Sequence, residues 1–112
     1  MQYIISGKVI KGDEYGRKIG FPTVNLEVNL GQLPSDGVYC GMATLDVKKY
    51  MAGIVVGPKG KIEAHIIGYS GDAYGRPVTL QINKFLREYK KFDSEEELIK
   101  QIKKDIDICS QA

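Results

Sequence analysis

The chain has few of the residues that build metal centres and disulfide frameworks. Its 112 residues include two cysteines and a single histidine. Cys40 and Cys109 stand far apart and neither belongs to a CxxC pair, so neither a zinc site nor a disulfide framework is expected. The sequence instead predicts two small buried thiols. For the single histidine, His65, a structural or exposed role is favoured over acid–base chemistry.

The chain also lacks a strong charge of one sign and any long apolar run. Its 16 basic and 14 acidic residues give a net charge of +2, which is too balanced to indicate a nucleic-acid partner. No apolar run approaches the length of a membrane span, and residues 1–5 lack the layout of a secretory signal. We therefore expect a cytoplasmic protein without a membrane partner, folded as one domain over residues 1–112.

Most of the chain has the pattern of short strands separated by glycine-containing turns. The strand-like runs cover residues 3–10, 37–45, 51–56, 61–69 and 77–85. Clusters of Gly, Pro, Ser and Asp separate several of these runs. Five or six short strands of this kind predict a mainly β fold, either an antiparallel barrel or a sandwich.

The hydrophobic period changes to that of a helix near the C-terminus. Ser94 and Glu97 have the spacing of a capping box, with Ser94 as the N-cap. The apolar residues at helical spacing are Leu98, Ile102, Ile106 and Cys109. The pattern predicts one amphipathic helix over residues 94–109 that packs on the strands, with its lysines on the solvated side.

A glycine-rich basic segment precedes a pair of small oxygen-bearing side chains. Thr23 and Asn25 are two residues apart, so in an extended segment they point to the same face, and their oxygens are ligands that Mg²⁺ accepts. The upstream glycines and basic residues are Gly12, Gly16, Gly20, Lys11, Arg17 and Lys18. The segment suggests a nucleotide phosphate site, although a plain hairpin turn remains the alternative because neither a Walker A loop nor the Rossmann glycine pattern is present.

The segments taken in order resemble the bacterial and eukaryotic riboflavin kinases, over nearly the whole chain. The similar segments are Gly7-Lys8-Val9, Gly16-Arg17-x-x-Gly20-Phe21-Pro22-Thr23-x-Asn25, Leu33-Pro34, Gly37-Val38-Tyr39, Ile62-Glu63-Ala64-His65, Asp72-x-Tyr74-Gly75, Leu86-Arg87 and Lys91-Phe92. In bacteria this domain often forms the C-terminal half of a bifunctional FAD synthetase, and the resemblance of this sequence is to that half alone. One departure is the short segment 54–60, where family members usually carry an Asn-Pro-Thr-Phe-like motif.

The resemblance implies a six-stranded antiparallel β-barrel of riboflavin-kinase type with one C-terminal α-helix. It implies transfer of the γ-phosphate of ATP to the 5′-hydroxyl of riboflavin, giving FMN and ADP. We also expect the chain to be a monomer. Thr23 and Asn25 would hold Mg²⁺ and nucleotide phosphates, and the loop from Gly12 to Gly20 would cover the nucleotide. Glu63 matches the catalytic carboxylate, and Arg87 would border the flavin site.

The residues alone support part of this assignment, because phosphoryl transfer needs charge neutralisation and an oriented hydroxyl. Glu63 alternates with Ile62 and Ala64 and therefore points away from their face. If those two residues face an outer layer or the helix, Glu63 faces a cavity. A solvent-facing strand glutamate is the competing interpretation.

Three functions remain open from the sequence. The first is an ATP-dependent riboflavin kinase, and the retention of Thr23, Asn25 and Glu63 favours it. The second is a catalytically impaired flavin- or nucleotide-binding barrel, which the short 57–60 turn favours. The third is a small β-barrel interaction domain whose motifs are coincidental.

Overall fold

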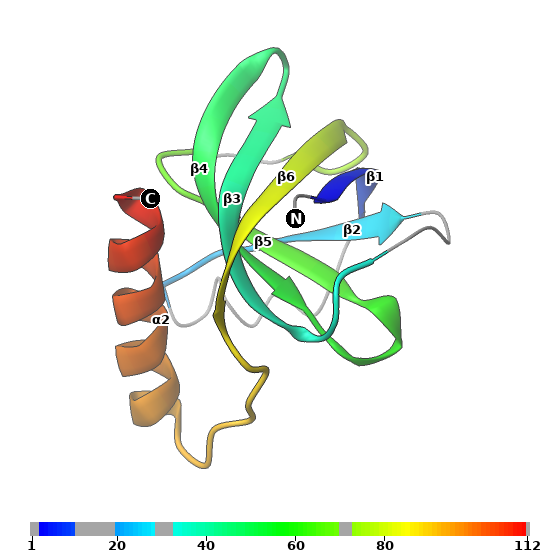
Figure 1. The fold of residues 1–112 in the computed structure, drawn as a ribbon. Coiled ribbons are helices and arrows are strands. Elements are labelled where there is room, and N and C mark those ends of the chain that lie inside the picture. The colour runs from blue at the N-terminus through cyan, green and yellow to red at the C-terminus, as the bar shows by residue number, and fades with distance from the viewer. Residues whose placement is uncertain (1–2, 11–19, 29–32, 70–72, 112) are drawn as a thin grey trace.

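The computed structural model describes residues 3–10, 20–28, 33–69 and 73–111. In this part of the chain six antiparallel strands close into a barrel in the order β1-β2-β5-β4-β3-β6, and one α-helix stands beside it (Figure 1). The elements are β1 (Tyr3–Ile10), β2 (Val24–Val28), β3 (Gly37–Leu45), β4 (Lys48–Val56), β5 (Ile62–Ile66), β6 (Pro77–Arg87) and α2 (Glu95–Ser110). The predicted six-stranded barrel with a C-terminal helix is confirmed.

Alternate side chains on every strand fill the barrel interior. Leu26, Ile54, Ile62, Ala64 and Leu80 come from four different strands, and each is at most 5% exposed. Successive side chains of a strand point to opposite faces, so the residues between these core positions point out of the barrel. The outward residues of β2, β5, β4, β3 and β6 contribute to the site.

The β3–β4 connection is tighter than the sequence predicts. Asp46 and Val47 both have positive φ, 51° and 64°, as the two central residues of a type I′ hairpin turn do. The strand β4 therefore begins at Lys48 and not at residue 51. The sequence hides this turn because an Asp-Val pair lacks the glycine that usually marks it. An ion pair between Asp46 and Arg76 ties the turn to the segment before β6.

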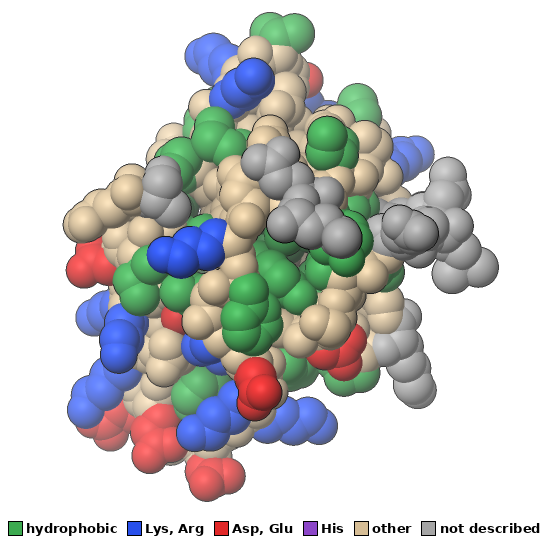
Figure 2. Space-filling view, in the orientation of Figure 1, with side chains coloured by type: hydrophobic (Ala, Val, Ile, Leu, Met, Phe, Trp, Pro, Cys, Tyr) green, Lys and Arg blue, Asp and Glu red, His purple; other side chains and the backbone are tan. Residues whose placement is uncertain are grey.

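The helix α2 begins as the capping box predicts. Ser94 has an extended backbone, and its Oγ accepts a hydrogen bond of 3.2 Å from the backbone N–H of Glu97. The helix packs against β3 and β4, while Lys100, Lys103 and Lys104 are exposed. On the face in Figure 2, acidic and basic side chains are interspersed along the side where α2 lies. Within the described residues, no helix combines the length and apolar character that a membrane crossing requires.

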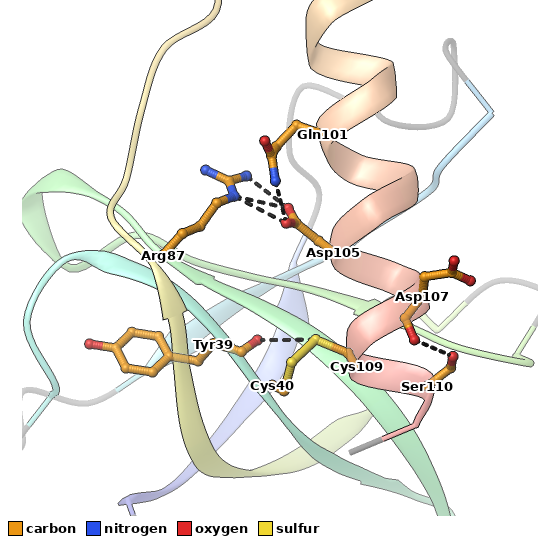
Figure 3. The surroundings of a disulfide bond; sticks show 8 residues. All are labelled: Tyr39, Cys40, Arg87, Gln101, Asp105, Asp107, Cys109 and Ser110. Carbon is orange, nitrogen blue, oxygen red and sulfur yellow. Dashed lines mark hydrogen bonds and ion pairs between the residues drawn. A yellow bond between two sulfur atoms is a disulfide. The ribbon is translucent and has the colours of Figure 1, made fainter.

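The two cysteines are joined to each other. Cys40 on β3 and Cys109 on α2 form a disulfide with a Cα–Cα distance of 5.1 Å (Figure 3). The predicted burial is confirmed, since the two residues are 1% and 0% exposed, but the prediction of unpaired thiols is wrong. A separation of 69 residues hides the pairing in the sequence, because only folding brings α2 onto β3.

Reduction of this disulfide is expected to lower the free energy of unfolding by about 2–4 kcal/mol, because the bond closes a long loop of the unfolded chain. Thermal unfolding with and without dithiothreitol measures the effect. A Cys40→Ala/Cys109→Ala double variant serves as the control and should not respond to the reductant. Identical unfolding of the oxidised and reduced parent protein, or two free thiols in the denatured, unreduced chain, would contradict the pairing.

Candidate active site

Strand register assembles a row of outward side chains across the barrel. Asn25 on β2 is paired with Glu63 on β5, and Glu63 is paired with Val55 on β4. Val55 is paired in turn with Val38 on β3, and Val38 with Arg87 on β6. Directly paired residues share a face of the sheet, so these five side chains form one continuous row on the outside of the barrel.

A cavity of about 230 Å³ lies between this row and the C-terminal segment. Its walls come from the outer face of the barrel, from the connection after β6, and from one side of α2. The lining residues are Phe21, Thr23, Val38, Gly53, Val55, Glu63, His65, Arg87, Tyr89, Lys90, Phe92, Leu98, Ile102, Asp105 and Ile106. The helix therefore directs much of its apolar stripe at a cavity. The lining is mostly apolar, with polar side chains that include Glu63 toward one end of the row and Arg87 at the other, as is usual for a small-molecule site.

Glu63 lines the cavity beside β2. Its side chain is 26% exposed, and Lys61 Nζ lies 3.7 Å from its Oε1, which makes a weak ion pair near the surface. From the sequence, Glu63 was expected to face a cavity if Ile62 and Ala64 faced an outer layer or the helix. In the structure Ile62 and Ala64 instead point into the barrel interior. Glu63 nevertheless faces a cavity, because α2 and the connection before it cover the outside of the barrel at this point.

Asn25 presents a buried oxygen beside this carboxylate. Asn25 is 8% exposed, and its Oδ1 has no hydrogen-bond partner among the described residues. Leaving a buried acceptor unsatisfied costs about 1–3 kcal/mol, so such an atom usually has a missing partner. Thr23, two residues earlier, is exposed and lines the cavity. A hydroxyl, an amide oxygen and a carboxylate thus lie on the outer face of the paired strands β2 and β5. Oxygens of this kind suit a hard cation such as Mg²⁺.

His65 secures the segment that leads into β2. Its Nδ1 lies 2.8 Å from the carbonyl oxygen of Pro22, and its ring meets the ring of Phe21 edge to face. A carbonyl oxygen can only accept, so Nδ1–H donates this bond. The bond ties β5 to the residues immediately before Thr23. These contacts give His65 the structural role favoured from the sequence.

Arg87 borders the cavity, but its guanidinium donates hydrogen bonds mainly to other protein groups. Its Nε and Nη2 donate to the carboxylate oxygens of Asp105 at 2.8–3.1 Å (Figure 3). Its Nη1 donates to the carbonyl oxygen of Glu88. Gln101 Nε2 adds a bond of 2.8 Å to Asp105 Oδ1. The guanidinium carbon also lies 5.6 Å from the ring centre of Phe92. This network fastens the end of β6 to α2 at the wall of the cavity.

The sequence model of the Flavokinase family, described as riboflavin kinase, matches residues 1–112. This chain belongs to the riboflavin kinase family. A curated relative, the RNA-binding riboflavin kinase RibR of Bacillus subtilis, is 37% identical over 111 residues, which are 92% of this chain and 48% of the relative. The chain thus spans about half the length of that relative.

Two solved structures share the fold. A chain described as a macrolide-efflux protein from Streptococcus pneumoniae superposes with a TM-score of 0.89 and 32% identity, covering 95% of this chain and 38% of that one. Riboflavin kinase from Trypanosoma brucei superposes with a TM-score of 0.77 and 20% identity, covering 98% of this chain and 76% of that one. The second likeness shows that the barrel and its C-terminal helix have the riboflavin kinase architecture.

The site residues predicted from the resemblance fall into two groups. Thr23, Asn25, Glu63 and Arg87 lie in or beside the cavity, although they come from well-separated parts of the chain. The predicted nucleotide-loop residues Gly12, Gly16, Arg17 and Lys18 lie outside the described residues. Gly20, the last of that loop, is exposed and has a φ of 93°.

The sequence did not lead us to predict that Asp105 and Gln101 take part in the network at the wall of the cavity. Asp105 is only 7% exposed, and it sits on the apolar side of α2, three residues after Ile102 and four before Cys109. That placement is the available signal, because an acidic residue inside a helical apolar stripe needs a buried partner. The sequence gives no means of choosing Arg87 as the partner, since the two residues meet only when α2 docks.

Proposed function

We propose that this chain transfers the γ-phosphoryl group of ATP to the ribityl 5′-hydroxyl of riboflavin, giving FMN and ADP. The observation that carries the proposal is the pairing of Asn25 with Glu63, which lines a mostly apolar cavity. The apolar walls suit the flavin ring system, and the oxygens on the outer face of β2 and β5 suit the reacting phosphate and hydroxyl. Membership of the riboflavin kinase family supports the same reaction.

Glu63 acts as the general base in this proposal. The 5′-hydroxyl of riboflavin becomes a good nucleophile only when its proton has an acceptor, and a positioned carboxylate can orient the hydroxyl and take that proton. The position of Glu63 on a paired strand limits its movement, which helps to fix the geometry of attack. Its ion pair with Lys61 is long and partly exposed, so the carboxylate stays available to substrate.

Thr23 and Asn25 would hold Mg²⁺ together with the nucleotide phosphates. The fit rests on the unpartnered Oδ1 of Asn25 and on Thr23 at the same edge of the cavity. When bound, Mg²⁺ neutralises charge on the phosphates during transfer. Gly12, Gly16, Arg17, Lys18 and Gly20 remain our proposed nucleotide-binding residues, and Arg87 remains a proposed flavin-border residue. The cytoplasmic, monomeric state likewise remains a prediction.

Incubation of the purified chain with riboflavin, ATP and Mg²⁺ is expected to yield FMN, which chromatography separates from riboflavin. Reactions without ATP or without Mg²⁺ serve as controls and should yield none. Absence of FMN from a folded protein that still binds riboflavin would contradict the kinase assignment. That result would instead favour the catalytically impaired flavin-binding barrel, whose supporting observation is the connection between β4 and β5, a single 3₁₀ turn at Pro58–Gly60.

A further inference from the structure

Gly53 occupies an unusual place in the barrel. It lies within β4, where it is paired with His65 on β5 and with Cys40 on β3, and it lines the cavity. Glycine inside a strand is unfavourable, because it loses more conformational freedom on folding than other residues and packs no side chain. A glycine in this position therefore needs a reason.

The two usual structural reasons do not apply to Gly53. Its φ is not positive, so the backbone conformation does not require glycine. A Cβ built on Gly53 meets no described atom within 4 Å. Gly41 shows the contrast, because a Cβ there would clash with the carbonyl oxygen of Gln81 on the neighbouring strand β6. The fold needs a glycine at position 41, whereas at position 53 it does not.

The open space at Gly53 is part of the cavity. Val55 lies two residues further along the same face of β4, and Ile102 and Ile106 of α2 line the same cavity. A side chain at position 53 would project among these apolar groups. An interior glycine without a structural reason often marks a place where a ligand comes close to the backbone.

We propose that Gly53 determines specificity for the acceptor substrate, by letting riboflavin lie against the backbone of β4. This inference rests on the proposed kinase function. Gly53 is separated from β2, which carries Asn25, by the intervening strand β5, so it is about 10 Å from the proposed phosphate site. Apart from its paired neighbour His65, the side chains named around it are apolar and match a flavin ring better than a triphosphate.

The test is a size series, Gly53→Ala, Gly53→Val and Gly53→Leu. The KM for riboflavin should rise with side-chain size, and so should the Kd for riboflavin measured by flavin fluorescence. For valine and leucine the rise should be about tenfold or more, which is the usual effect of one or more methyl groups that do not fit a binding pocket. The KM for ATP should stay within about twofold of the parent value. Thermal stability should stay equal or rise, because the new side chain restricts the unfolded chain and valine suits a strand.

Asn83→Val is the matched control, since Asn83 is an exposed residue of β6 and does not line the cavity. It should leave both KM values unchanged. Three variants with the parent KM for riboflavin would overturn the proposal. So would a loss of stability that parallels the loss of affinity, or an equal rise in the KM for ATP. Failure of the proposed function itself is recognised separately, because the parent chain would then form no FMN, whereas failure of this inference leaves FMN formation by the parent chain intact.

Discussion

Replacement of Glu63 with glutamine is expected to lower kcat for FMN formation by about 10²-fold or more, which is the usual scale of general-base effects. Glutamine keeps the size of the side chain and some of its hydrogen bonding but cannot accept the proton. Binding of riboflavin should remain measurable, because the apolar walls of the cavity are untouched. Steady-state kinetics together with flavin fluorescence separates the two effects.

Glu27→Gln provides the matched control for this substitution. Glu27 is an exposed glutamate of β2, paired with Lys8, and it does not line the cavity. The control should keep the parent kcat, and both variants should unfold near the parent temperature. A folded Glu63→Gln protein that forms FMN at the parental rate would remove Glu63 from the mechanism, even if the chain is a riboflavin kinase.

Replacement of Asn25 with alanine is expected to raise the Mg²⁺ concentration needed for half-maximal activity by about tenfold or more. Even residues that only support metal ligands typically contribute 10–100-fold to metal affinity, so a direct ligand should contribute at least as much. The folded state should lose little stability, because Asn25 Oδ1 makes no hydrogen bond to the described residues. A magnesium titration at saturating riboflavin measures the shift.

Asn83→Ala is the control here, as an exposed asparagine of β6 away from the cavity. Riboflavin affinity should be the same in the parent and in both variants. If Asn25→Ala kept the parent magnesium dependence, the assignment of Asn25 as a ligand would have to be abandoned. A large loss of thermal stability would point instead to a structural role for the buried amide.

Local patterns in the sequence predicted those features that depend on neighbouring residues. The capping box at Ser94 set the start of α2, and β-type alternation located β1 and β3 with their observed bounds. Both signals act over a few residues and need no knowledge of the rest of the fold. The number of strands in a closed barrel came from the resemblance to riboflavin kinases, because alternation alone also fits a sandwich.

The candidate site depends on contacts between distant segments, so the sequence predicted it less completely. The resemblance to riboflavin kinases singled out Glu63, and alternation indicated only that it points away from the face of Ile62 and Ala64. The layer that Glu63 faces depends on where α2 docks, which the sequence does not show. The Cys40–Cys109 disulfide joins β3 to α2, and the Arg87–Asp105 ion pair joins β6 to α2. The spacing of these residues along the chain predicts neither contact. Gly53 shows the same limit, because only the empty space above it distinguishes it from a structural glycine.

The most direct test of the account is a crystal structure of the chain with riboflavin, ADP and Mg²⁺. The flavin should lie in the cavity between the barrel and α2, with its ribityl 5′-oxygen about 2.6–3.2 Å from the carboxylate of Glu63. The metal ion should be bound at Thr23 and Asn25, next to the nucleotide phosphates. Riboflavin bound elsewhere, or a 5′-oxygen directed away from Glu63 toward solvent, would contradict the proposed site.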